Sequence, residues 1–495
     1  MSDVYLNFVN GQWKQGSSGQ WDENRNPARP SELIGKATRS NPVDLDRAID
    51  AAHKAQAEWA RMPRPKRGAI IAKAASLLRG KLENFAKTIT REEGKNLNEA
   101  RGEVQKAINC LEFTAAEARR PTGQVIPSEV PGTMIYTTRA PLGVVAIVTP
   151  WNFPVCIPIW KIAAALVEGN AVLFKPASNT PASATLLTRL FEEAGVPAGV
   201  LNLVYGSGAM VGEVIAKDPR VRGISFTGSN EVGGELNAAA ARGLKRVQLE
   251  LGGKNALIVC ADADLEAAVD AAVMGAFGST GQRCTATSRV IVENPVLESF
   301  TQKLVEKTRT LRVGDGFGEG APMGPVIDEK SLASLLEAIE IAKKEGATLL
   351  CGGERVGQPG PDTGYFLAPT LFAGVTPSMK IAQEELFGPV LGILSADSFD
   401  HAIEIANQVK FGLTSSVYTR DITRALSYAE RMETGMLHIN SPTVGGEAQA
   451  PFGGMKQTGL GRREMGAAGP EFFSEVKTVY LEGAATGPRS NSNLY

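Results

Sequence analysis

Residues 144–175, VVAIVTPWNFPVCIPIWKIAAALVEGNAVLFK, contain the pattern that decides the fold. Val144–Val148 is a short run of apolar, mostly β-branched residues, and Ala171–Phe174 is a second short apolar run. Such runs predict strands that are buried on both faces of a sheet. The apolar stretch Pro158–Val167 between them is long enough to form a helix. A strand, a helix and a further strand in this order predict a βαβ unit with parallel strands.

The same alternation continues beyond this unit. Ala182–Ala194 predicts a helix, and Leu201–Val204 and Gly223–Phe226 predict two more strands. A second α/β region starts near Gly252, with a strand at Asn255–Val259. Helical periodicity predicts further helices at Asp44–Arg61, Arg67–Phe85, Asp264–Phe277, Leu332–Lys344 and Phe399–Gln408. The predicted fold class is therefore α/β, with parallel sheets covered by helices on both faces.

Length and composition limit the classes of protein. A chain of 495 residues fits two or three domains. Its hydrophobic content of 43% and charged content of 21% are typical of globular proteins. The net charge of -1 gives no reason to expect nucleic acid or an anionic membrane as a partner. We find no secretory signal and no uncharged apolar stretch near the ~20 residues of a membrane span, so we expect a cytoplasmic protein.

Cysteine and histidine usage points to one reactive thiol. The five cysteines and three histidines are scattered, which argues against a disulfide framework, a zinc cluster and a Ser-His-Asp triad. We therefore expect no catalytic metal. Cys284 lies in FGSTGQRCTA, residues 277–286, where Gly278 and Gly281 let a substrate approach closely. A thiol is a good nucleophile once it is deprotonated. The absence of a nearby histidine argues against a cysteine protease.

Two polar residues could assist such a nucleophile. Glu250 lies in LELGGKN, residues 249–255, at the end of a predicted strand and before two glycines. A carboxylate in that place can act as a general base that activates water. Asn152 lies in TPWNFP, residues 149–154, after the strand Val144–Val148. Ligands bind at the carboxyl ends of parallel strands, and an Asn amide there can stabilise an oxyanion.

Several strand ends could hold a dinucleotide. Lys175 follows the strand Ala171–Phe174, and a cation there can bind a ribose hydroxyl or a phosphate. The segment FTGSNEVG, residues 226–233, leads from a strand into a helix whose N-terminus suits a pyrophosphate. Gly206, Gly208 and Gly212 form a glycine pattern one residue longer than the usual dinucleotide fingerprint. In QEELFGP, residues 383–389, an acid can hold ribose hydroxyls and a ring can flank a nicotinamide.

Each motif alone is compatible with a structural role, such as a buried thiol, a strand-end glutamate or a turn-forming asparagine. Together, in this order and spacing, the motifs resemble the aldehyde dehydrogenase superfamily over essentially the whole chain. Cys284 follows Glu250 by 34 residues, and Asn152 precedes both. The segment EELFGPV at residues 384–390 and the run PFGGMKQTGLGR at residues 451–462 complete the resemblance.

The resemblance implies three structural units. A Rossmann-like cofactor domain is expected at residues 1–119 and 139–250, and an α/β catalytic domain at residues 251–455. Residues 120–138 and 471–495 are expected to form a small β oligomerisation flap, so the chain should assemble as a homodimer or homotetramer. Within that segment, the small and polar residues 483–495 are typical of a flexible tail or of an arm ordered by a partner chain.

The resemblance also implies roles for residues. Cys284 attacks the aldehyde carbon, the Asn152 amide stabilises the oxyanion, Glu250 activates water for hydrolysis of the thioester, and Lys161 matches a position implicated in proton relay. The expected cofactor contacts are Trp151, Lys175, Ser178, Gly208, Phe226, Gly228, Ser229, Leu251, Glu385 and Phe387. The expected substrate contacts are Phe153, Arg283 and Phe452.

Other readings within the superfamily remain open. Relatives that pass the thioester to coenzyme A typically lack a glutamate at position 250, so Glu250 favours hydrolysis. A non-catalytic relative is disfavoured because Cys284, Glu250 and Asn152 are all present. The chain most resembles the semialdehyde branch, particularly the α-ketoglutaric semialdehyde dehydrogenases, and succinate semialdehyde is a related substrate. Broad activity on simple aliphatic or aromatic aldehydes is the alternative.

Two residues bear on specificity. Arg283 precedes the nucleophile and could bind an acid group at the far end of a semialdehyde, but it is equally consistent with a side chain that points away from the substrate tunnel. Ser178 follows Lys175 by three residues, where strongly NAD-selective relatives usually have a glutamate. A serine there leaves room for a 2′-phosphate, so we expect NADP to be preferred and NAD to be accepted. Alternatively, Ser178 is only the N-cap of the next helix.

Overall fold

The computed structural model of the chain describes residues 3–320, 323–357 and 363–482. A large eight-stranded sheet has the order β22-β12-β11-β8-β9-β10-β2-β3, and its five central strands, from β12 to β10, are parallel. Antiparallel strands lie at both edges. The strands are β22 (Gly459–Leu460), β12 (Arg246–Glu250), β11 (Val221–Thr227), β8 (Val144–Val148), β9 (Ala171–Lys175), β10 (Leu201–Leu203), β2 (Asn7–Val9) and β3 (Gln12–Lys14).

Helices cover both faces of this sheet because its central strands are apolar on both sides. In β8, Val144 and Ala146 pack with one group of helices, whereas Val145 and Ile147 pack with another. The first group is α1 (Pro42–Arg61), α7 (Gly208–Lys217) and α8 (Asn230–Ala241). The second is α2 (Arg64–Gly80), α3 (Leu82–Glu93), α4 (Leu97–Glu117), α5 (Cys156–Val167) and α6 (Pro181–Ala194). Alternate side chains of one strand thus belong to separate cores.

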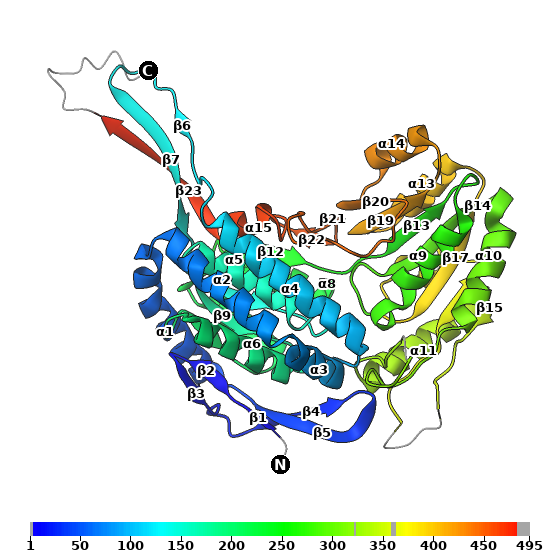
Figure 1. The fold of residues 1–495 in the computed structure, drawn as a ribbon, viewed down its shortest axis with the longest axis horizontal. Helices are drawn as coiled ribbons and strands as arrows, with labels where there is room; N and C mark the ends of the chain where they lie inside the picture. Colours follow the sequence, from blue (N-terminus) through cyan, green and yellow to red (C-terminus); the bar gives the residue numbers. More distant parts are fainter. Residues whose placement is uncertain (1–2, 321–322, 358–362, 483–495) are drawn as a thin grey trace.

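A seven-stranded sheet forms the second α/β unit (Figure 1). Its order is β15-β16-β17-β14-β13-β19-β20, and every neighbouring pair except β15-β16 is parallel. The strands are β15 (Thr348–Cys351), β16 (Thr370–Ala373), β17 (Val390–Ala396), β14 (Thr287–Glu293), β13 (Asn255–Val259), β19 (Thr414–Tyr418) and β20 (Met436–Ile439). One face packs on α9 (Leu265–Phe277) and α10 (Asn294–Arg309). The other packs on α11 (Glu329–Lys344), α12 (Lys380–Gln383), α13 (Phe399–Asn407) and α14 (Ile422–Arg431).

A three-stranded arm projects away from both units at the upper left of Figure 1. β23 (Ser474–Glu482) pairs with β7 (Thr133–Pro141), which pairs with β6 (Val125–Ile126), all antiparallel. The remaining elements are β1 (Asp3–Tyr5), β4 (Trp21–Asn26), β5 (Arg29–Thr38), η1 (Gly278–Gly281), β18 (Phe411–Gly412), β21 (Met455–Lys456) and α15 (Ala468–Phe472). The arm joins segments far apart in the sequence. The tail at residues 483–495 lies outside the described residues.

The elements mostly agree with the sequence-based prediction, with one error among the helices. Residues 67–85 were expected to form a single helix, but the chain breaks at Lys81 between α2 and α3. Lys81 has φ −113° and ψ 10°, outside the helical region. The break lets α3 turn its own apolar face, including Phe85 and Ile89, into the core. α4 was not predicted, although Asn96 and Glu99 form a capping box at its start. Among the described residues, no helix has the length and apolarity to cross a membrane.

Candidate active site

A cavity of about 540 Å³ gathers residues from both α/β units. The walls come from α4, α5, the end of β12, the Cys284 loop and the segment from Val444 to Phe452. Six residues named from the sequence line it, namely Phe153, Glu250, Leu251, Arg283, Cys284 and Phe452. The sequence separates these residues by up to 299 positions, so only the fold brings them together.

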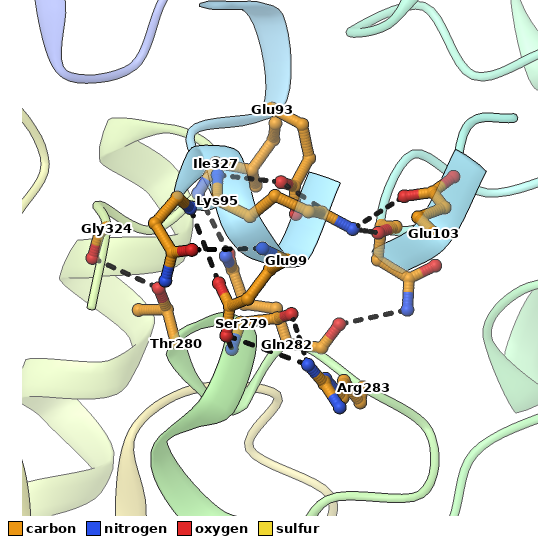
Figure 2. A network of polar contacts seen from close by, with 12 residues as sticks. Glu93, Lys95, Glu99, Glu103, Ser279, Thr280, Gln282, Arg283, Gly324 and Ile327 are labelled. Atoms are coloured by element: carbon orange, nitrogen blue, oxygen red, sulfur yellow. Dashed lines mark hydrogen bonds and ion pairs between the residues drawn. The ribbon is translucent and has the colours of Figure 1, made fainter. Parts of the chain in front are cut away.

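The loop before Cys284 is held in an unusual backbone conformation. Ser279 and Thr280 have φ values of 50° and 61°. This left-handed region of backbone conformation is rare for residues other than glycine. Glu99 on α4 accepts a hydrogen bond from the Ser279 backbone N–H at 2.6 Å. The Thr280 hydroxyl donates to the Gly324 carbonyl at 3.0 Å, and Figure 2 shows both contacts. These partners come from both sides of the loop, so they fix the position of the thiol that follows.

The environment of Cys284 keeps its sulfur protonated when no ligand is bound. Burial, together with the nearby Glu385 and Glu250 carboxylates, raises the pKa of the Cys284 thiol to about 12. The Lys106 ammonium opposes this effect. The Cys284 backbone carbonyl accepts a hydrogen bond from Asn255 Nδ2 at 2.8 Å, which anchors the residue to the start of β13. Deprotonation must therefore accompany reaction.

Asn152 is positioned from two directions. Its side-chain Nδ2 donates to the Gln282 carbonyl at 2.9 Å, two residues before Cys284. Its backbone carbonyl accepts a hydrogen bond from Lys95 Nζ at 2.5 Å, and the same ammonium donates to Glu103 at 2.8 Å. The Asn152 Oδ1 atom is buried and has no hydrogen-bond partner. One N–H of the amide remains for a further acceptor, as an oxyanion-binding amide requires.

Glu250 is a buried carboxylate at the end of β12, and its Oε2 has no hydrogen-bond partner. Burial raises the pKa of Glu250 well above its usual range, and the Glu464 carboxylate raises it further. A β-carbon at Gly453 would overlap Glu250 Oε1, so a glycine at that position makes room for the carboxylate. A strongly raised pKa in a cavity is typical of a general acid or base.

Lys161 does not line the cavity but reaches it through Glu464. Its Nζ forms an ion pair with Glu464 and donates to Ser225 Oγ at 2.8 Å. Trp160 Nε1 donates to the other Glu464 oxygen at 2.7 Å. Glu464 lines the cavity near Glu250 and was missed by the sequence analysis. It lies two residues beyond the glycine-rich run at 451–462, and this proximity was the available signal.

The dinucleotide-binding candidates lie at the ends of β9 and β11 and at the helix starts beyond. Lys175 is buried, burial lowers its pKa to about 8, and Nζ donates to the Pro176 carbonyl. A β-carbon at Gly208, the first residue of α7, would meet no atom within 4 Å. Ser229 is the N-cap of α8, and Val232 in the first turn of that helix is 45% exposed to solvent. A helix N-terminus without a side chain at its first residue lets a phosphate approach the backbone N–H groups, which fits a dinucleotide.

Close packing shapes this edge. A β-carbon at Gly228 would overlap the Phe226 ring, and one at Gly233 would overlap Leu251, so both glycines allow α8 to approach the sheet. Ser178 is exposed and lines a separate cavity of about 380 Å³. The alternative that Ser178 caps the next helix is wrong, because α6 has Thr180 at its N-cap.

The remaining cofactor candidates lie where the two units meet. Glu385 Oε1 accepts a hydrogen bond from the Gly253 backbone N–H at 3.0 Å. Burial raises the pKa of Glu385 to about 7. Phe387 has φ 58° and packs edge-on against Trp151, with ring centroids 5.5 Å apart. The described residues contain no group of three or more His, Cys, Asp or Glu side chains able to hold a metal ion.

Comparisons with known proteins agree with this geometry. The model of the aldehyde dehydrogenase family matches residues 13–479. The chain is 46% identical to the alpha-ketoglutaric semialdehyde dehydrogenase of Bacillus subtilis (strain 168), over 97% of this chain and 98% of that protein. It is 44% identical to the 2,5-dioxopentanoate dehydrogenase of Saccharolobus solfataricus, over 94% and 97%. A crystal structure of an NAD-dependent aldehyde dehydrogenase from Sinorhizobium meliloti has a TM-score of 0.95 at 36% identity, covering 99% and 96%.

These matches place the chain among the oxidoreductases that act on aldehydes with NAD(P). The chain belongs to the aldehyde dehydrogenase family. The family and the α/β fold that its motifs predicted are both confirmed.

Proposed function

We propose that this enzyme oxidises a short semialdehyde, with 2,5-dioxopentanoate as the first candidate, to the corresponding carboxylate. The observation that carries this proposal is a single cavity that holds the Cys284 thiol, the Glu250 carboxylate and two cationic side chains, Lys106 and Arg283. Relatives with 46% and 44% identity are named for α-ketoglutaric semialdehyde and 2,5-dioxopentanoate. These are two names for one five-carbon aldehyde with an acid at its far end.

The first half of the reaction belongs to Cys284 and Asn152. The Cys284 thiolate adds to the aldehyde carbon, and the Asn152 amide N–H and the Cys284 backbone N–H donate to the resulting oxyanion. A bound NAD(P) would supply the hydride acceptor, and loss of hydride from this carbon would leave a thioester on Cys284. Trp151, Phe387 and Glu385 would hold the nicotinamide and its ribose, whereas Lys175, Gly208 and Ser229 would hold the adenosine end and the pyrophosphate.

The second half belongs to Glu250. Its carboxylate takes a proton from water, the oxygen attacks the thioester carbonyl, and the Cys284 sulfur leaves as the thiolate. Glu464 lies near enough to raise the pKa of Glu250, and it pairs with Lys161, which donates to Ser225. We propose that the proton leaves through these groups. A carboxylate placed in this way supports hydrolysis rather than transfer of the acyl group to coenzyme A.

The substrate class is tested by comparing kcat/KM for 2,5-dioxopentanoate and for pentanal, a neutral aldehyde with the same number of carbons. A hydrogen bond to a charged group contributes about 1.5–3 kcal/mol, so we expect the semialdehyde to be favoured roughly ten- to hundred-fold. Equal or better use of pentanal would contradict the proposal. It would favour the alternative of a broad-specificity enzyme for aliphatic and aromatic aldehydes.

We also propose that NADP is preferred and that NAD is accepted. Ser178 is uncharged and exposed. Arg39 lines the same cavity but is paired with Asp22, so the support for NADP is the absence of a carboxylate at position 178. A glutamate at position 178 would repel a 2′-phosphate, and like charges about 4 Å apart cost roughly 1 to 4 kcal/mol.

The Ser178→Glu variant should therefore lose activity with NADP far more than activity with NAD, by about ten- to thousand-fold in the ratio of their kcat/KM values. Steady-state kinetics with each cofactor measures this ratio. Ser178→Ala is the matched control, since it removes the hydroxyl without adding charge. An unchanged ratio in the Glu variant would mean that Ser178 has no part in cofactor selection.

The division of the chain stays a proposal of the same kind. We assign the eight-stranded sheet and its helices to cofactor binding and the seven-stranded sheet to the catalytic domain, with a boundary near residue 251. The arm carries exposed apolar residues, including Val125, Val476 and Tyr480, the last 66% exposed. An apolar surface on a projecting sheet suits contact with a second copy of the chain, which supports a homodimer or homotetramer.

A further inference from the structure

We infer that Lys106 on α4 is the cation that binds the distal carboxylate of the substrate. This inference rests on the proposed semialdehyde function and names the residue that selects the acid. The sequence motifs alone suggest only Arg283 for this task. Both side chains line the cavity that holds Cys284, but they differ in what already binds them.

The other cations at the site have acidic partners within the protein. Lys95 pairs with Glu103 at 2.8 Å, and Lys161 pairs with Glu464. Arg283 lies 3.6 Å from a Glu99 oxygen and donates to Ser279 Oγ at 2.8 Å, as Figure 2 shows. Its buried Nε has no hydrogen-bond partner, but the Glu99 carboxylate already balances its charge. Within residues 3–320, 323–357 and 363–482, no acidic side chain forms an ion pair with Lys106. Of the two described cations that line the cavity, Lys106 is therefore the one without an acidic partner.

The surroundings of Lys106 favour an anion over a neutral group. Its Nζ lies 5.5 Å from the centroid of the Trp160 ring and 5.8 Å from that of the Phe452 ring. The ring faces attract the ammonium, but they carry no negative charge and cannot form an ion pair with it. The nearby carboxylates of Glu103 and Glu464 are already occupied by donors. The exposed Glu447 lines the same cavity, but it accepts from Gln449 and forms no ion pair with Lys106. A carboxylate that enters the cavity thus supplies what the half-buried Lys106 lacks.

The position of Lys106 relative to the nucleophile fits a short substrate. The positive charge of Lys106 lowers the pKa of the Cys284 thiol and that of the Cys156 thiol, which lines the same cavity. The ammonium and the Cys284 thiol also line the same cavity. A short chain with an aldehyde at one end and a carboxylate at the other can engage both groups at once, which fixes the aldehyde carbon against the sulfur.

The test is the substrate selectivity of a Lys106→Met variant of the full-length enzyme with saturating NADP. We expect kcat/KM for 2,5-dioxopentanoate to fall roughly ten- to hundred-fold, mainly through KM, and kcat/KM for pentanal to fall far less. Loss of the charge near Cys284 slows both substrates alike, so the ratio between them isolates binding of the carboxylate. Lys106→Arg should restore most of the selectivity. Lys87→Met, an exposed site on α3, is the matched control.

Inhibition gives a second readout that needs no turnover of the semialdehyde. 2-Oxoglutarate, the product of the proposed reaction, should compete with pentanal in the wild type and at least tenfold more weakly in Lys106→Met. An equal loss on both aldehydes, or unchanged inhibition, would overturn the role of Lys106. If the wild type itself preferred pentanal, the proposed function would fail together with this inference. A wild type that prefers the semialdehyde and a variant that keeps the preference would refute Lys106 alone.

Discussion

In a Cys284→Ala variant, we expect aldehyde oxidation to fall by about four orders of magnitude or more while NAD(P) binding stays close to that of the wild type. The reason is chemical, because removal of the nucleophile removes the bond through which the aldehyde carbon is held during oxidation. Cys284 lies in the substrate cavity, whereas the adenosine end of the proposed cofactor site lies around α7 and α8. Steady-state turnover and cofactor titration by fluorescence measure the two quantities separately.

A second thiol in the same cavity provides the control. Cys156 also lines the cavity, but burial in the wall at the start of α5 raises its pKa well above the usual range. A Cys156→Ala variant should keep most of its turnover, because its sulfur hydrogen-bonds with Cys110, which has no part in the proposed reaction. Substantial oxidation by Cys284→Ala, or loss of oxidation in Cys156→Ala alone, would move the nucleophile to another position.

The second large effect concerns Glu250. A Glu250→Gln variant should form the thioester in a pre-steady-state burst of reduced cofactor, of about one equivalent per active site, and then turn over roughly 10²- to 10⁴-fold more slowly than the wild type. The amide keeps the size of the side chain but cannot take a proton from water. Stopped-flow absorbance of the reduced nicotinamide separates the burst from the slow phase.

The role of Glu250 as a base also predicts how the rate of thioester hydrolysis changes with pH. The pKa of Glu250 is raised, so its basic form becomes populated only as the pH rises through that value. The rate of hydrolysis in the wild type should therefore rise with pH, and the Glu250→Gln variant should lose this rise. Glu447→Gln, an exposed acid on the cavity wall, should retain it. Equal loss of burst and steady state in Glu250→Gln would assign Glu250 to the first step instead.

The sequence predicted the features that depend on local pattern. The strand at 255–259 has the observed bounds, and the helix at 182–194 differs by one residue, because apolar runs and turn residues define both. Cys284, Glu250 and Phe452 could be named from their motifs and do meet in one cavity. Their spatial arrangement follows from the packing of two sheets, which no local pattern encodes.

The features that escaped prediction depend on partners distant in sequence. Glu464 matters because Lys161, 303 positions away, pairs with it and because it raises the pKa of Glu250. Among the described residues, Lys106 is distinctive because it lacks the acidic partner that Lys95 and Arg283 have, and such a difference appears only once the carboxylates around it are placed in space. The break at Lys81 likewise follows from how α3 packs in the core.

The most direct test of the central claim is the mass of the Glu250→Gln enzyme, quenched in acid during turnover of 2,5-dioxopentanoate with NADP. A thioester that forms on Cys284 and is no longer hydrolysed predicts one acyl group per chain, located by peptide mapping on the fragment that contains Cys284. The adduct should disappear in the Cys284→Ala, Glu250→Gln double variant and on treatment with hydroxylamine. An unmodified chain despite a burst of reduced cofactor, or an acyl group on another residue, would contradict the account.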